Sequence, residues 1–590
     1  MSPQRLTFIE SLMDENIQTA ESLISKWDSE TTAYACSTSL LFSGNRQQAK
    51  EYLKAIKHLR SAMQYFVAYN PSSHKLVRSQ TLMQTAMKRL EKEFYRLLKT
   101  NKEYLDSESV STHSYSSRPS RGSLSDMEDD LEDEFKFSDD KVSEVERSSI
   151  AALADLKLIA DCMIASGYGK ECVKIYKKIR KSIVDEALYH LGVEKLSFSA
   201  VKKMDWDLLE IKMKKWLHAV KTAVKTLFYG ERILSDLVFS ASDSIRESCF
   251  TEICKDGALT LFAFPENIAN CKKTPEKIFR TLDLYKAIAD LWAETESIFS
   301  FESTSVVRSQ AVNSLNKLGE AVHSMLVDFE AEIQKDNSKS GVPGGGIHPL
   351  TRYVMNYIAF LADYSGSLSD IIADWPLTVC TPLPEAYFGS PDSEDNISSP
   401  IAVRLAWLIL VLFCKLDGKA ELYKDGSLSY LFLANNLQYV VVKARTSNLH
   451  FILGEEWVVK QEAKVTQYAA KYERLAWSKV FASLPDNPTA QIPPEKVRNS
   501  FRQFNSSLED ACNKQSSWIV PDEKLRDEIK TSLWRRIVPV YRAFYDKYEV
   551  SASREPGMGN ECFARFAPDD LANYLSNLFV TKIEIAETQA

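Results

Sequence analysis

The sequence predicts an all-α fold, arranged as a rod or a stack of helical bundles. Glycine is scarce, with 19 residues in 590, which is less than half the usual frequency. Proline is absent from Ser120 to Phe264, from Glu276 to Val342 and from Ile401 to Leu484. Apolar residues recur at helical spacing through these spans, and no run of strict alternation is bounded by turn residues. Together these features favour long helices over strands.

Residues 1–105 contain three sets of apolar residues in steps of three or four. The sets begin at Leu6, Leu53 and Leu76, and the turn dipeptide Asn70-Pro71 separates the last two. Such steps place the apolar side chains on one face of a helix. We therefore expect two or three amphipathic, coiled-coil-like helices. Their apolar stripes need partners, which are either the rest of this chain or other proteins.

Residues 106–146 have a different composition. They are rich in serine and acidic residues and poor in aliphatic ones, so burial cannot offset an ordering entropy of about 1 to 2 kcal/mol per residue. Between Asp126 and Glu146, eleven acidic residues oppose two lysines, a net charge of -9 against -7 for the whole chain. We expect a disordered acidic loop and a mildly basic folded body. Serines that follow arginines in this loop are candidate phosphorylation sites, where phosphate would add negative charge: Ser120, Ser123 and Ser125.

The spacing predicts helical bundles over residues 147–335, a Gly-rich loop over 336–347, and further bundles over 348–495. A stripe from Trp206 to Leu227 alternates steps of three and four, which indicates the spine of a long buried helix. A second loop, over residues 376–400, is rich in proline.

Residues 496–590 form a C-terminal helical region whose clearest part is LWRRIVPVYRAFYDKY, which begins at Leu533. At about 100° per residue its apolar side chains fall in one broad arc, which should be buried. Pro539 lies on the polar side, so we expect a bend and not a break. Between Lys524 and Lys547, seven Lys or Arg oppose three Asp or Glu, a net charge of +4. The apolar arc comprises Leu533, Trp534, Ile537, Val538, Val540, Tyr541, Phe544, Tyr545 and Tyr548.

Cysteine and histidine patterns give no sign of a catalytic or metal site. The ten cysteines are scattered, without a CxxC pair or a His/Cys cluster at ligand spacing, which fits a reducing compartment. His348 precedes Pro349 and indicates the start of a helix, and the sequence implies no nucleophile or acid beside it. We expect no enzymatic activity, no cofactor and no metal.

Targeting and membrane-spanning segments are not expected either. The N-terminus is acidic and lacks the apolar core of a signal peptide. The most apolar stretch, Leu405 to Cys414, is too short to cross a bilayer. We expect a cytoplasmic protein that reaches membranes from their surface.

Several runs of residues resemble the family of the seventy-kilodalton subunit of the exocyst, the octameric complex that tethers secretory vesicles to the plasma membrane. The resemblance is of the plant type. It covers roughly residues 150–580, and residues 1–105 in pattern alone. The matching runs are HPLTRYVMNY from His348, LANNLQYVVVKA from Leu433, the stretch from Val497 to Tyr548, and ECFARFAPDDLANYLSNLF from Glu561. In the second run, we expect Asn435 and Asn436 to bond to neighbouring backbone.

The resemblance implies an elongated rod of stacked helical bundles without catalytic activity. It implies that the N-terminal helices bind other exocyst subunits and that a basic surface near the C-terminus binds phosphatidylinositol bisphosphate at the plasma membrane. In the last run, animal relatives carry two basic residues three apart around an aromatic, whereas here Cys562 and Arg565 flank Phe563, so one charge is missing. The expected lipid-facing residues are Arg535, Arg536, Arg542, Lys547 and Arg565.

The charge of this surface limits what it can do alone. At about 1 kcal/mol per basic residue near an anionic leaflet, a net charge of +4 supplies roughly 4 kcal/mol, which is millimolar binding. Stable recruitment would then need other basic faces or partner subunits.

Two alternatives follow from the same residues. One is an ordinary solvated face on a diverged interaction scaffold, acting in autophagy or immunity with little lipid binding. The other is nucleic-acid binding, which the acidic net charge and the lack of exposed aromatics among the basic residues disfavour.

Overall fold

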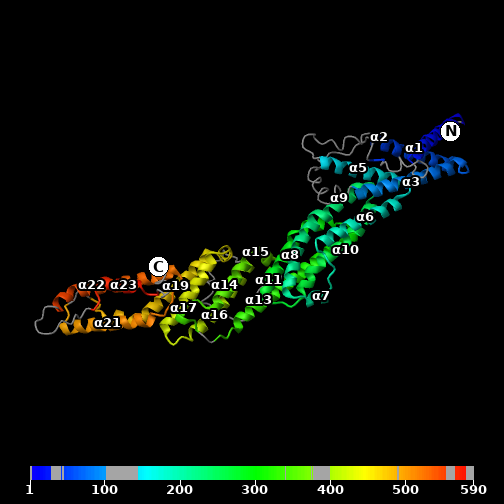
Figure 1. Ribbon diagram of the computed structural model, residues 1–590. Helices are drawn as coiled ribbons and strands as arrows, with labels where there is room; N and C mark the ends of the chain where they lie inside the picture. The colour runs from blue at the N-terminus through cyan, green and yellow to red at the C-terminus, as the bar shows by residue number, and fades with distance from the viewer. Residues whose placement is uncertain are drawn as a thin grey trace. The chain divides into compact units, whose positions relative to one another are not determined.

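The computed structural model describes residues 3–27, 41–42, 46–100, 144–338, 341–373, 375, 399–487, 491–552 and 565–579, and these residues form helices and no strand (Figure 1). The predicted all-α fold is therefore confirmed. The chain divides into two compact units, and the division falls inside two helices, α11 and α13. The first unit comprises Met1–Lys273 and Arg280–Ala321, and the second comprises Thr274–Phe279 and Val322–Ala590.

The first unit begins with three long helices, α1, α2 and α3, as the N-terminal periodicity predicts. The apolar stripe of α2, including Tyr52, Ile56, Leu59 and Phe66, is buried within the chain, where α2 packs against α1, α3 and α5. The helices of this unit are α1 (Pro3–Lys26), α2 (Arg46–Tyr69), α3 (His74–Thr100), α5 (Glu144–Ala165), α6 (Gly169–His190), α7 (Phe198–Lys203), α8 (Trp206–Thr222), the π-helical turn η1 (Ala223–Phe228), α9 (Tyr229–Val238), α10 (Asp243–Ala269), α12 (Trp292–Ile298) and η3 (Glu302–Thr304). Two further helices, α11 (Ile278–Asp290) and α13 (Ser305–Lys335), contribute residues to both units.

A buried polar network lies in the core of the first unit. The guanidinium of Arg180 donates to Oε2 of Glu231 at 2.7 Å from Nη2 and 2.9 Å from Nε, and both side chains are almost fully buried. The hydroxyl of Tyr176 donates to Oε1 of Glu231 at 3.1 Å. Phe94 and Phe239 enclose the tyrosine ring. Because every member has a partner, the cost of burying the two charges is partly offset.

The stripe from Trp206 to Leu227 forms the predicted spine. Met213, Trp216 and Val220 are buried, and Nε1 of Trp216 donates to the carbonyl of Leu261 at 2.8 Å. The helix runs on through η1 into α9, so the π-helical turn sits within one continuous helical segment.

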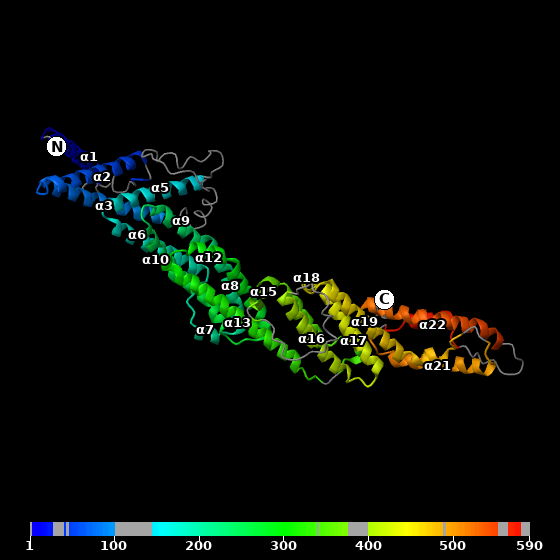
Figure 2. The ribbon, with the colours of Figure 1, turned by 180° about the vertical axis from the view of Figure 1, so that it is seen from behind.

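In the C-terminal part of the second unit, the helices α21 and α22 lie side by side in both views (Figures 1 and 2). Its elements are η2 (Pro275–Lys277), η4 (Pro343–Gly345), α14 (Pro349–Ala362), α15 (Ser365–Ala373), α16 (Pro400–Ala420), α17 (Gly426–Arg445), α18 (Leu449–Leu453), α19 (Glu455–Ala476), α20 (Ser478–Ser483), α21 (Pro494–Gln515), α22 (Glu523–Ala552) and α23 (Pro568–Ser576).

Two asparagines of α17 bond to backbone groups, as predicted for the run LANN, but most of these groups are far away in the sequence and not neighbouring. Asn435 donates from Nδ2 to the carbonyls of Gly345 and Ile519, each at 2.8 Å. Asn436 donates to the carbonyl of Gly346, and its Oδ1 accepts from the backbone N–H of His348. The expectation that both amides bond to backbone is confirmed.

His348 begins α14, as the sequence predicts. Its Nδ1 accepts a hydrogen bond from the backbone N–H of Leu350 at 3.0 Å, and Pro349 occupies the first helical position. Burial lowers the pKa of the His348 imidazole, and the nearby Lys419 acts in the same direction. Both effects favour the neutral imidazole, which is the state that accepts this bond.

Parts of the predicted domain organisation lie outside the described residues. These parts are most of the acidic loop over 106–146, with Ser120, Ser123 and Ser125, and most of the proline-rich loop over 376–400. The domain boundaries remain predictions.

Candidate functional site

The candidate surface lies on α22, which carries Arg535, Arg536, Arg542 and Lys547, and just before α23, where Arg565 lies. The opposite face of α22 is fixed by aromatic packing against α21. The ring of Tyr541 stacks on Phe504 with centroids 4.3 Å apart, and Phe544 lies 4.8 Å from Phe501. The hydroxyl of Tyr541 also donates to the carbonyl of Phe566 at 2.7 Å, which holds the start of α23 against α22.

The predicted burial of the apolar arc is correct at its centre and wrong at Trp534. Leu533, Ile537, Tyr541 and Phe544 are fully buried, whereas 46% of Trp534 is exposed. At 100° per residue Trp534 lies within the arc, between the buried Tyr541 and Val538, so its exposure reflects a local gap in the cover that the neighbouring helices give α22. The helix continues through the exposed Pro539 without a break, as predicted, and the expected bend stays a prediction.

Arg536 is held against its own chain. Its guanidinium lies 3.9 Å from the ring centroid of Phe481 in α20 and 3.5 Å from Oε2 of Glu473 in α19. Burial raises the pKa of the Glu473 carboxyl, while a hydrogen bond from Ser532 at 2.8 Å and the charge of Arg536 favour its ionised form.

Two more of the expected lipid-facing residues also have carboxylate partners. Nη2 of Arg542 donates to Oδ1 of Asp569 at 2.7 Å, in a pair exposed to solvent. Arg565 forms an ion pair with Glu509 of α21. Surface pairs of this kind contribute about 0 to 1 kcal/mol to stability. Their main effect is to reduce the charge that the surface offers to another anion.

The remaining two residues differ from each other. Lys547 is half-buried, with its amine 5.1 Å from the ring centroid of Tyr548. Arg535 is exposed, and it has no hydrogen-bond or ion-pair partner among the described residues. An open basin on the same face of α22 is lined by Lys524, Asp527, Glu528, Thr531, Ser532, Arg535 and Arg536.

The sequence therefore predicted that the cations share one face, but it did not predict the carboxylates that form ion pairs with three of them. Glu473, Glu509 and Asp569 lie outside the stretch whose net charge was counted, on α19, α21 and α23. No local pattern marks them, because each pair forms between different helices. Cys562 and Phe563 lie outside the described residues.

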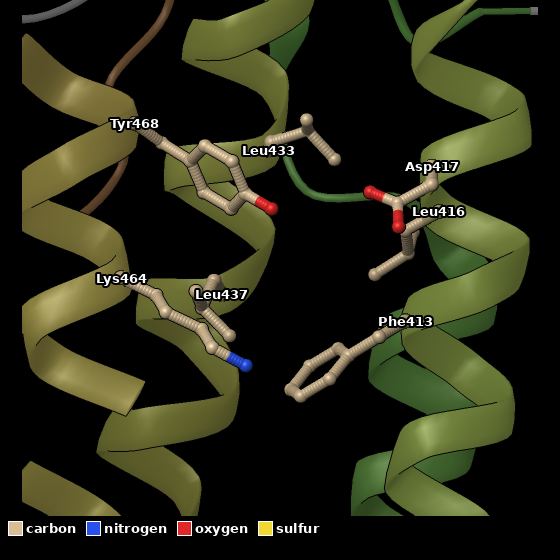
Figure 3. A pocket seen from close by; sticks show the side chains of 7 residues that line it. All are labelled: Phe413, Leu416, Asp417, Leu433, Leu437, Lys464 and Tyr468. Carbon is tan, nitrogen blue, oxygen red and sulfur yellow. The ribbon is translucent and has the colours of Figure 1, made fainter. Parts of the chain in front are cut away.

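A small cavity lies between α16, α17 and α19, and its size rules out a small-molecule site. Its volume is about 20 Å³, room for about one water molecule. The side chains of Asp417 and Lys464 come from opposite sides of it (Figure 3). Burial lowers the pKa of the Lys464 amine. The other lining residues are Phe413, Leu416, Leu433, Leu437 and Tyr468.

Neither a metal centre nor a membrane-spanning helix is found in the described part of the chain. No three or more His, Cys, Asp or Glu side chains there are placed to hold a metal ion. None of the helices in these ranges is both long enough and apolar enough to cross a bilayer.

Comparison with known families decides what kind of protein this is. The family that describes the C-terminal part of the Exo70 exocyst complex subunit matches residues 214–577, and the family that describes the N-terminal part of exocyst complex component Exo70 matches residues 16–100. The chain belongs to the Exo70 family. Exo70 proteins are non-catalytic exocyst subunits, so the predicted family and the absence of enzymatic activity are both confirmed.

Individual Exo70 proteins match over most of the chain. Exocyst complex component EXO70B1 of Arabidopsis thaliana is 31% identical over 85% of this chain and 80% of its own length. Component EXO70A1 of the same plant is 29% identical over 97% of this chain and 89% of its own length. The solved structure of S. cerevisiae Exo70 matches with a TM-score of 0.55 at 15% identity, over 92% of this chain and 96% of that one, and so shares the fold.

Proposed function

We propose that this Exo70 chain helps tether secretory vesicles to the plasma membrane as a subunit of the exocyst, and that its α22 surface binds phosphatidylinositol bisphosphate. The observation that carries the lipid contact is Arg535, which is exposed and has no partner among the described residues. It lies on a helix whose opposite face is locked by aromatic packing. A cation presented on a rigid helix is available to a phosphate without first breaking an ion pair.

The carboxylate pairs set the strength of this contact. Arg536, Arg542 and Arg565 would each have to exchange a carboxylate for a phosphate. The α22 surface of the isolated chain then contributes less binding free energy than the roughly 4 kcal/mol that a net charge of +4 would give. Recruitment in the cell would depend on the other exocyst subunits as well.

Vesicle flotation tests the lipid contact. The chain is mixed with phosphatidylcholine vesicles that contain or lack phosphatidylinositol bisphosphate, at low salt. We expect flotation with the phosphoinositide that Arg535→Glu weakens. Lys215→Glu is the matched control, because it changes the same charge at an exposed position of α8. Equal losses in both variants, or no flotation of the wild type, would refute the lipid contact.

For the contact with other subunits, we propose the N-terminal helices α1 to α3. Large apolar side chains remain exposed where α2 ends and α3 begins, at Val67, Tyr69 and Val77. Substitution of Val67 and Val77 by Ser should reduce co-purification with exocyst subunits, whereas Leu208→Ser on α8 should not. Unchanged co-purification would contradict this assignment.

A second candidate is an interaction scaffold of the same fold with little lipid binding. The observation in its favour is that three of the five expected lipid-facing residues are already paired within the chain. In that case the wild type would remain unbound to the vesicles while still co-purifying with protein partners.

A further inference from the structure

Trp534 is an anomaly of the α22 surface. The side chain belongs to the apolar arc, yet 46% of it is exposed to solvent. Leaving a large apolar side chain in water forgoes about 1.5 to 3 kcal/mol of burial free energy. The residue that follows it in the chain is Arg535, the expected lipid-facing arginine without a partner among the described residues.

The backbone around Trp534 is held in place. Nζ of Lys530, one turn earlier, donates to the carbonyl of Ser576 at 2.6 Å, and Tyr541, two turns later, donates to Phe566. These two bonds fix α23 alongside α22 on either side of Trp534. The indole is therefore exposed on a rigid support, and the loss of conformational entropy on binding is small.

We propose that Trp534 enters the headgroup layer of the membrane when Arg535 meets anionic lipid. This inference rests on the proposed lipid contact of α22. Tryptophan is the side chain most favoured at a membrane–water interface, because its ring is apolar and its N–H can still bond to polar groups. An anionic lipid surface offers an interfacial layer for the indole of Trp534 and negative charge for the adjacent guanidinium of Arg535.

The carboxylate pairs strengthen this assignment. Because Arg536 and Arg542 are compensated by Glu473 and Asp569, charge alone gives the surface little attraction for a membrane. An inserted indole adds an apolar contribution that salt does not screen. The proposal therefore predicts a binding component that persists at high salt and depends on Trp534.

The test compares Trp534→Ala with Leu208→Ala, which removes a similarly exposed apolar side chain from α8. Sedimentation with phosphatidylcholine vesicles containing phosphatidylinositol bisphosphate is measured at low and at high salt. We expect Trp534→Ala to bind about tenfold more weakly than the wild type at both salt concentrations. The Leu208→Ala variant should bind as the wild type does.

Quenching by brominated acyl chains gives a second readout that does not depend on affinity. With saturating brominated vesicles, wild-type tryptophan fluorescence should be quenched. Trp534→Phe should lose that quenching and Trp292→Phe should keep it.

The outcomes separate the two proposals. In one outcome the wild type binds, Arg535→Glu weakens binding, and both Trp534→Ala and Trp534→Phe behave as the wild type. That result would overturn the insertion of Trp534 but would still support the lipid contact. Absence of wild-type binding would overturn both. If Trp534→Ala binds vesicles normally but no longer co-purifies with a protein partner, the side chain belongs to a protein interface and the insertion is overturned.

Discussion

Oδ1 of Asn436 accepts a hydrogen bond from the backbone N–H of His348 at 2.8 Å, joining residues 88 positions apart. The same oxygen accepts from Oγ1 of Thr351 at 2.7 Å, and the amide nitrogen donates to the carbonyls of Gly346 and Phe432. One fully buried side chain thus connects α17, the start of α14 and the glycine loop.

Replacement of Asn436 by Leu should strongly destabilise the second unit. The substitution leaves buried backbone groups unpaired, at a cost of about 1 to 3 kcal/mol for each group. Urea unfolding followed by circular dichroism should show a lower midpoint. Asn448→Leu is the control, because Asn448 bonds to Asp363 at the surface. Equal midpoints for the two variants would show that the buried amide is dispensable.

The capping role of His348 predicts a pH dependence. Burial lowers the pKa of its imidazole, so its contribution to stability is complete above the unfolded value of about 6.5. That contribution is lost as the pH falls from 6.5 through the lower folded value, because the unfolded state binds a proton first. His348→Asn keeps a capping oxygen and does not titrate. The variant should therefore lose less stability than the wild type between pH 7.5 and 5.5.

The midpoint of urea unfolding at the two pH values measures this difference. His218→Asn, at an exposed position on α8, serves as the control and should keep the wild-type slope. A His348→Asn slope equal to that of the wild type would argue against the neutral cap.

The pair Arg180 and Glu231 should behave as a buried salt bridge. Arg180→Met leaves the carboxylate of Glu231 buried without its cation, which costs about 3 to 5 kcal/mol. The double variant Arg180→Met, Glu231→Gln should be more stable than Arg180→Met alone. Lys177→Met, which breaks a surface pair with Glu252, should cost much less. Additive losses in the double variant would contradict the coupling.

Gly344 should tolerate alanine less well than Gly454. Both have positive φ, of 65° and 80°, which costs an L-residue roughly 1 to 2 kcal/mol. At Gly344 a Cβ would in addition lie 2.4 Å from the carbonyl oxygen of Ser517, whereas nothing lies within 4 Å at Gly454. Thermal melts should rank Gly344→Ala below Gly454→Ala. The reverse order would mean that the backbone around Gly344 moves enough to accommodate the added methyl group.

Removal of the carboxylate that pairs with Arg542 should strengthen membrane binding. Asp569→Asn frees one arginine, worth about 1 kcal/mol near an anionic leaflet, or roughly fivefold in affinity. Vesicle sedimentation at low salt measures the change. Asp207→Asn makes the same change in net charge on α8, and a gain as large in that variant would assign the effect to total charge instead of Arg542.

The sequence predicts those features of the structure that depend on residues near each other in the chain, and it does not predict those that depend on other helices. The buried residues of α22 and the cap at His348 follow from spacing and from the neighbouring proline, so they could be predicted. The partners of Arg536 and Arg542 could not be, because Glu473 and Asp569 come from other helices. The exposure of Trp534 depends on how far neighbouring helices extend, which periodicity does not encode.

The π-helical turn over Ala223–Phe228 determines where this long helix can change length. A π turn holds one residue more than an α turn needs, so deletion of a single residue there restores ordinary helix and leaves both flanks in phase. The same deletion within α8 would rotate everything beyond it by about 100°. Leu234 and Val238 would then swing out of the interior. Along this helix, the π turn is the position at which a one-codon deletion would leave the same side chains facing the core.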